Sequence, residues 1–281
     1  MRTLAAFLLA ALLARAADPV EFAVVPASGE GCVVTEEERI EGKIRYEAVK
    51  GKSKSDFGKR KTDFLSLKRW QYDEQVVEAG EAQSKRTRDF AIATKEEFEE
   101  DGKTRKKTQF PHHQRQVTVT RTEEGLAVFI PGEQPEDGLY EQGWMDVFPK
   151  MLPKEALAIG KEYDIDGKAV MRSWSKGIFG DKGTGGGGKG KYVEDVKLGR
   201  VRCAKLYVNV TMKGEAKDLP SIEMAVTGYV WYALDEKRVV KAELSGPAVV
   251  RMRAKDGDVG DVDVIVTGTI KETFQAEAMP K

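Results

Sequence analysis

Residues 220–253 constrain the fold more than any other stretch, because they carry two alternating β-prone runs around a charged turn. Small or apolar side chains fall at every second position from Ile222 to Tyr232, and again at Val240, Ala242 and Leu244. A period of two is typical of antiparallel strands with one buried face. The stretch therefore predicts a hairpin in a mainly β protein, with Val240 on the buried face.

The same alternation recurs along most of the chain. It is found at 39–49, 85–94, 103–121, 162–174, 201–212 and 262–270, whereas 63–78 fits a strand or a helix and is assigned to a strand. Strands that follow one another through turns form a meander, so we expect an antiparallel meander forming a curved sheet, half-barrel or barrel. Pro153 and Gly160 bracket one of the one or two short helices that we expect, at 153–160.

A connection rich in Pro, Gly and acidic residues at 131–143 separates two strand-rich halves. We place the N-terminal β-rich half at 17–143 and the C-terminal antiparallel half at 144–281. One continuous sheet shared by both halves is the alternative.

Residues 1–16 have the features of a secretory signal peptide. Arg2 supplies a positive start, 4–13 are apolar, and Ala14 and Ala16 provide the small residues of a cleavage site. The apolar run is too short to span a bilayer. We therefore expect an exported protein, periplasmic or extracellular, with no transmembrane segment after cleavage.

Charge is balanced over the whole chain but not along it. There are 46 Lys and Arg against 46 Asp and Glu, so net charge indicates no particular partner. Residues 43–69, however, carry ten basic and three acidic residues, and the basic group within them is Lys52, Lys54, Lys59, Arg60 and Lys61. This group could bind an anionic envelope polymer, or form a solvated loop balanced by the acidic stretch 96–101. No nucleic-acid partner is expected.

The glycine-rich run GTGGGGKG at 183–190 nearly matches a phosphate-binding loop. Gly190 replaces the required Ser or Thr, and no buried strand leads into the run. We interpret it as a flexible loop between strands.

The sequence predicts no catalytic site, metal site or cofactor. His112 and His113 are the only histidines and are adjacent, and the aspartates of 256–263 lack the spacing of an EF-hand. An enzyme would need a buried cluster of ionisable groups, which the sequence does not reveal. Cys32 and Cys203 could form a disulfide after export, or remain two unpaired thiols.

The candidate ligand-binding residues are Trp144, Trp174, Tyr229 and Trp231. Large aromatic side chains line ligand cavities or fill cores. Tyr229 and Trp231 lie on the face opposite Val230, so that face packs on another layer or on a ligand if it is not solvated.

Three segments carry a resemblance to known proteins: TRKKTQFPHHQRQVTV at 104–119, FPKMLP at 148–153 and IGKEY at 159–163. Over residues 85–270 their order resembles that of β-rich secreted bacterial proteins, often from planctomycete-like genomes, in which an "LP…vG…W/Y" segment introduces the C-terminal sheet. Tyr163 stands where Trp is common in that family. More distantly, the chain is similar to LolA-like half-barrels, which shield lipid acyl chains. Neither resemblance implies catalytic residues.

We therefore expect a non-enzymatic envelope protein that acts as a binding or structural module. One version is a carrier that holds a lipid or other apolar ligand in a concave β cavity. Another is an electrostatic adaptor for anionic envelope polymers. A tightly packed interior would exclude the carrier.

Overall fold

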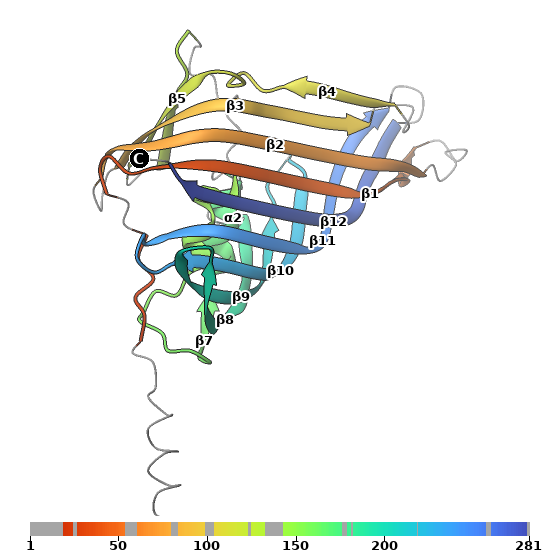
Figure 1. Cartoon of the computed structure of the whole chain (residues 1–281). Helices are drawn as coiled ribbons and strands as arrows, with labels where there is room; N and C mark the ends of the chain where they lie inside the picture. Colours follow the sequence, from red (N-terminus) through yellow and green to blue (C-terminus); the bar gives the residue numbers. More distant parts are fainter. Residues whose placement is uncertain are drawn as a thin grey trace, which may run out of the picture.

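A computed structural model of the chain describes residues 19–24, 27–53, 61–79, 84–98, 104–122, 125–132, 143–175, 179–180, 182–217, 219–256 and 260–279. The predicted signal peptide, the centre of the 131–143 connection and residues 257–259 of the aspartate-rich stretch 256–263 lie outside these residues. The described part is one antiparallel sheet of twelve strands (Figure 1).

The strands run in chain order as β1 (Gly31–Ser53), β2 (Lys61–Glu78), β3 (Ser84–Phe98), β4 (Arg105–Gln109), β5 (Gln116–Thr122), β6 (Gly125–Phe129), β7 (Glu162–Ile165), β8 (Thr184–Leu198), β9 (Val201–Gly214), β10 (Ser221–Ala233), β11 (Arg238–Asp256) and β12 (Gly260–Ala278). Their order in the sheet is β6-β5-β3-β2-β1-β12-β11-β10-β9-β8-β7, and β4 pairs with the far end of β3. The predicted antiparallel meander is confirmed. Among the described residues the sheet does not close, since β6 and β7 form its two ends.

The two sequence halves meet in the middle of the sheet, where β1 pairs with β12. This pairing runs from Cys32 opposite Ala278 to Ala48 opposite Val262. Both halves therefore contribute to one continuous sheet.

One face of the curved sheet, the inner face, carries the core. On β1 it is formed by the even-numbered residues from Cys32 onward, and the main apolar cluster extends from Val34 through Phe274 to Val210. A plug packs on this face. We define the plug as η1 (Trp144–Asp146), η2 (Phe148–Met151) and α2 (Gly167–Trp174). Figure 1 shows α2 beneath one end of β11 and β12, whereas the long strands continue past it toward the other end.

The only α-helix of the described residues differs from the one predicted. Residues 153–160 are irregular, and α2 forms within 162–174, where a strand was expected. Asp166 is its N-cap, and its side chain accepts a hydrogen bond of 3.1 Å from the N–H of Ala169. A Cβ at Gly167 would lie 2.3 Å from the carbonyl oxygen of Thr211, so glycine lets the helix begin directly on the sheet. Close packing on β8 and β9 thus overrides the alternating pattern of the segment.

The glycine-rich run 183–190 is also a correction, because it forms the first half of β8 instead of a loop. A Cβ at Gly188 would lie 2.1 Å from the carbonyl oxygen of Asn209, and one at Gly190 would lie 2.1 Å from the Tyr163 ring. The glycines allow a close approach of neighbouring backbone and side chains, which is a recognised use of glycine within strands.

The predicted hairpin 220–253 is confirmed as β10 and β11, with one exception. The register shifts between Trp231 and Tyr232, which leaves Val240 as an extra residue. Val240 therefore packs with Cys203 and Trp231 in a small cluster of its own, and not with Ala242 in the core.

Candidate functional site

Three carboxyl groups lie side by side on the inner face, buried beneath the plug. Glu36 and Glu38 come from β1, and Glu272 comes from β12 directly opposite Glu38. On the other side of β1, Glu38 lies opposite Lys68 of β2. The three glutamates are between 1% and 3% exposed. We call these three carboxyl groups together with Lys68 the carboxylate cluster.

Two tryptophans of the plug are hydrogen-bonded to this cluster. The main-chain N–H of Trp144 donates to Oε1 of Glu36, and the Trp144 indole donates to Oε2 of Glu38 over 2.8 Å. The Trp174 indole donates to the same Oε2 over 3.3 Å, and Nζ of Lys68 lies 3.1 Å from the other oxygen of Glu38. Glu38 is thus the anchor of both η1 and α2 on the sheet.

Glu272 is the least satisfied member of the cluster. Among the described residues, neither of its oxygens has a hydrogen-bond donor, and the same is true of Oε2 of Glu36. The register makes Glu36 and Glu272 diagonal neighbours across the β1–β12 pair, a spacing that long side chains bridge. A carboxyl group that holds its proton at either position can donate a hydrogen bond to the other.

The protonation states follow from burial and from the single cation. Burial raises the pKa of Glu36 to about 8. The hydrogen bond from the N–H of Trp144 opposes this rise, and the nearby Glu38 charge adds to it. Burial, followed by the charges of Glu36 and Glu38, raises the pKa of Glu272 well above its usual range. Burial acts the same way on Glu38, but Lys68 and the two indole hydrogen bonds outweigh it and hold the pKa of Glu38 below its usual value. Glu38 is therefore the member that ionises first as pH rises, and Glu36 and Glu272 keep their protons to higher pH.

A second buried charged group adjoins the cluster and also contacts the plug. Arg88 of β3 donates over 2.7 Å to Glu74 of β2 and over 2.9 Å to Asp146 of η1, and Arg86 lies 3.1 Å from Glu74. Arg88 is 1% exposed. These two bases and two acids balance one another, so the excess negative charge beneath the plug belongs to the carboxylate cluster.

The sequence contains a signal for this site that was not among the predicted features. The alternation of 39–49 places Ile40 on the buried face, and extending it backward by two and four residues places Glu38 and Glu36 there. Glu272 likewise falls between Ile270 and Phe274 on the inner face of β12. Acidic residues at inward positions of a strand are the signal.

Past the plug, the inner face is apolar and partly exposed. We call this part the distal inner face and define it by Ile44, Phe64, Val250, Val264 and Val266. Val266 pairs with Ile44 on one side and Val250 on the other, so the residues form a continuous surface across β1, β12 and β11. All five are partly exposed, in contrast to Ile270, which is fully buried at its border.

A surface groove of about 790 Å³ adjoins this region, between the β9–β10 connection and the ends of β11 and β12. Leu219 and Met252 line it and are 43% and 42% exposed. The ion pair between Arg253 and Asp263, at 2.9 Å, lies in the same groove. Met252 is paired with Val264 of the distal inner face, whereas Arg251, Arg253 and Ile265 bring the groove around to the opposite face of β11 and β12.

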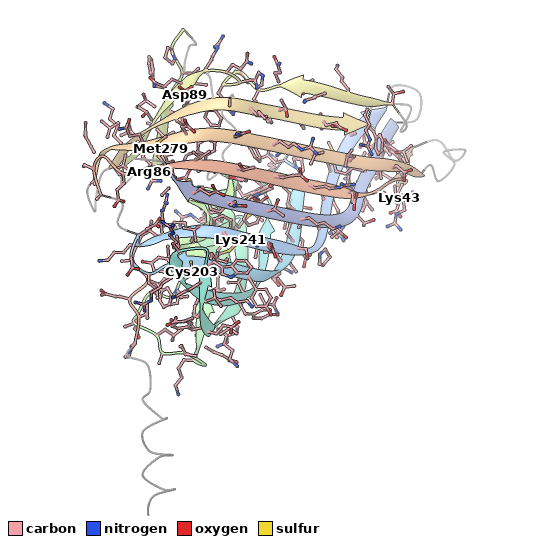
Figure 2. The ribbon with its side chains drawn as sticks, viewed as in Figure 1. Lys43, Arg86, Asp89, Cys203, Lys241 and Met279 are labelled. Atoms are coloured by element: carbon pink, nitrogen blue, oxygen red, sulfur yellow. The ribbon has the colours of Figure 1, made fainter. Side chains whose placement is uncertain are left out.

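The four aromatic residues predicted to bind a ligand do not form one site but lie as two pairs on opposite faces of the sheet. Trp144 is in the core and Trp174 lies at its edge, where both hold the plug. Tyr229 and Trp231 are on the outer face, where Lys205 and Lys241 lie over their rings at 4.6 and 4.9 Å. Figure 2 labels Lys241 and Cys203 in this part of the sheet.

The predicted basic group is described only at its ends. Lys54, Lys59 and Arg60 lie outside the described residues, and Lys52 and Lys61 fall at the ends of β1 and β2. Nearby described bases on the outer face are paired with acids: Lys43 with Asp63 and Arg69 with Glu37. Figure 2 shows Lys43 at the end of the sheet opposite to Arg86.

The proposed disulfide is not formed. Cys32 and Cys203 are free, buried thiols on β1 and β9, with β12, β11 and β10 between them in the sheet. Burial raises the pKa of each thiol to about 11. The thiols are therefore neutral and serve as small apolar side chains.

The fold and the site together define an open, curved antiparallel sheet with a plug held over buried acids. No group of His, Cys, Asp and Glu suited to a metal ion occurs among the described residues. Nor does any described helix have the length and apolar character needed to cross a bilayer.

The chain matches no protein-family model, and no curated protein sequence matches it. Among solved structures, the crystal structure of an outer membrane channel from Pseudomonas putida F1 aligns with 92% of this chain and 99% of that chain. The two proteins are 6% identical with a TM-score of 0.23, and a similarity this low indicates neither the fold nor the function of this chain.

Proposed function

We propose that this protein is an exported, non-enzymatic binding module of the bacterial envelope that holds an apolar chain, such as a lipid acyl chain, on the inner face of its sheet. The observation that supports the proposal is the distal inner face. There a continuous surface of Ile, Val and Phe side chains stays partly exposed beside a fully packed core.

The packed part of the interior limits where a ligand fits. Phe148 of η2 and Val170 and Met171 of α2 are fully buried between the plug and the sheet, so this half of the inner face has no room for a ligand in this conformation. The carrier proposal therefore applies to the distal inner face and the groove that adjoins it. Exposed contiguous apolar surface of this kind marks ligand grooves and interaction sites.

A binding role also fits the acids better than a catalytic one. Glu36 and Glu272 are 1% exposed, so no substrate reaches them in this conformation. The contacts of Glu36 and Glu38 with Trp144 hold the plug, which is a structural task.

The test uses a fluorescent acyl-chain probe and a matched pair of variants. Val266→Asp places a charge on the distal inner face, whereas Thr267→Asp places it at the neighbouring, solvent-exposed position. We expect the full mature chain to bind the probe, and Val266→Asp to weaken binding at least tenfold, because a charge in an apolar groove must be desolvated. Thr267→Asp should bind as the unmodified protein does. Equal binding by both variants, or no binding by the unmodified protein, would refute the proposal.

Native mass spectrometry of the protein purified from its own envelope supplies the natural occupant. An apolar molecule extracted at a fixed ratio to the protein supports a carrier. A bare protein under the same conditions argues against one.

A further inference from the structure

We infer that the carboxylate cluster is a proton-controlled latch: while Glu36 and Glu272 are protonated the plug stays on the sheet, and when they lose their protons the plug is released. Release would lengthen the open inner face from its distal part toward β8 and β9. The inference concerns the regulation of the proposed binding surface and rests on that proposed function.

The first support is a charge imbalance in a dry layer. The buried acids that face one another beneath the plug are Glu36, Glu38, Glu74, Asp146 and Glu272, and the bases are Lys68, Arg86 and Arg88. If all were ionised, the layer would hold two negative charges without a counterion. Burial of unpaired charge is strongly unfavourable, so two of the acids must be neutral for this packing to exist.

The second support is that the plug itself is bonded to these acids. Trp144 donates to Glu36 and Glu38, and Trp174 donates to Glu38. Among the described residues, the bases that act on Glu36 and Glu272 are Arg88 and Lys68, which are already counted above. Trp174 of α2 contributes a neutral indole, and β1 adds the Cys32 thiol, which burial keeps neutral. A change of charge at Glu36 or Glu272 is therefore felt first where η1 and α2 meet the sheet.

The third support is that the plug can separate from the sheet while the central ladders stay paired. The sheet beneath it is held by the long β1–β12 and β11–β12 ladders. The plug is three short helical segments, and β7, which lies between η2 and α2, pairs only with β8 at the end of the sheet. The plug can therefore leave without breaking the β1–β12 and β11–β12 ladders. Local opening of such a unit is favoured over unfolding of the whole domain.

Opening exposes the two acids to water, where they lose their protons at an ordinary pKa. Each proton released on opening raises the ratio of open to closed molecules by up to tenfold per pH unit, in the range between the pKa of the open state and that of the closed state. Two protons give up to a hundredfold per unit. The latch is therefore closed in acid and opens as pH rises.

Hydrogen exchange of the full mature chain without ligand tests this directly. Exchange is followed by mass spectrometry from pH 5 to pH 8.5 and corrected for the intrinsic chemical rate. We expect the opening of peptides from 144–151 and 167–174 to rise at least tenfold per pH unit, while peptides from β10 and β11 stay protected. Protection of the plug that does not vary with pH, or an equal loss in β10 and β11, would overturn the latch.

Two variants on β12 separate the latch from a general effect of charge. Glu272→Gln cannot release a proton at this position, so the rise of plug opening with pH should become about tenfold smaller per pH unit. Glu277→Gln, at an exposed position of the same strand, should leave the pH dependence of plug opening unchanged. If Glu272→Gln does not fold, Glu36→Gln removes the other proton and keeps an oxygen for the N–H of Trp144. Equal slopes in all variants would refute the assignment. Because no ligand is present, a protein that fails to bind the acyl probe can still show the latch, and the two proposals fail independently.

Discussion

The raised pKa of Glu36 makes the stability of the whole protein depend on pH in a direction opposite to that of most proteins. The usual pKa of the carboxyl group is 4.5, and in the folded protein it is about 8. Between these values the folded state keeps a proton that the unfolded state has lost, so rising pH favours unfolding. Stability is greatest near or below pH 4.5 for this group and is lost as pH rises toward 8.

The size of the effect follows from the shift. Each pKa unit corresponds to 1.36 kcal/mol, so Glu36 alone removes about 4 kcal/mol of stability between pH 5 and pH 8. Glu272 acts in the same direction. Glu38, whose pKa is lowered, stabilises the protein above its usual pKa, and this contribution is lost only as pH falls below that value. A loss of about 4 kcal/mol is comparable with the total stability of many domains.

Urea unfolding of the unmodified protein and of Glu36→Gln at pH 5, 6.5 and 8 measures this. Glutamine cannot release a proton, so the free energy of unfolding of the variant should rise by about 4 kcal/mol relative to that of the unmodified protein from pH 5 to pH 8. A constant difference in stability caused by the amide itself does not affect this comparison. Glu37→Gln, on the outer face of the same strand, is the control and should follow the unmodified protein. A difference between Glu36→Gln and the unmodified protein that is constant with pH would refute the reasoning.

Three further substitutions test other parts of the structure by urea unfolding. Arg88→Leu leaves Glu74 and Asp146 buried without their shared cation and should cost about 3–5 kcal/mol, with a much smaller loss if both acids are replaced as well. Phe22→Ala removes a buried ring between Tyr192 and Tyr232 and should cost about 3 kcal/mol, whereas exposed Glu21→Ala should be neutral. Gly188→Ala should cost about 1–3 kcal/mol because its Cβ meets a backbone carbonyl, and Gly185→Ala, which meets nothing within 4 Å, should cost little; equal effects would contradict the close-approach role.

The strands were predictable where one face is buried and the other solvated. The pairs β1–β12 and β10–β11 follow the alternation of Ile40, Ile270, Val230 and Ala242, because a period of two directly reflects two chemically different faces. The plug was not predictable in this way. Its helix begins at Gly167 because the backbone of β9 leaves no room for a side chain, and that contact joins residues distant in the sequence.

The glycines of β8 were misread for the same reason. A run of glycines has no side-chain pattern, so local rules favour a loop. Its strand conformation comes from pairing with β9, which holds Gly188 against Asn209 and Gly190 beneath Tyr163. Tertiary contact overrides local propensity here.

The carboxylate cluster was partly visible in the sequence. Glu36 and Glu38 fall at inward positions, but only the pairing of β1 with β12 and β2 shows that Glu272 and Lys68 lie beside them. The position of Trp144 over these acids depends on the path of the plug, which no periodicity encodes.

The pairing of the first long strand with the last has a consequence for how the chain folds. Cys32 pairs with Ala278, so the central ladder of the sheet joins residues from the two ends of the sequence. Closing such a loop is entropically expensive and makes folding slow, whereas β8 to β12 are neighbours in sequence and pair through short turns. During synthesis the complete sheet cannot form until β12 has been made, because β12 pairs with both β1 and β11. The N-terminal strands therefore keep an unpaired edge until β12 is available, and unpaired edges of this kind are prone to aggregation.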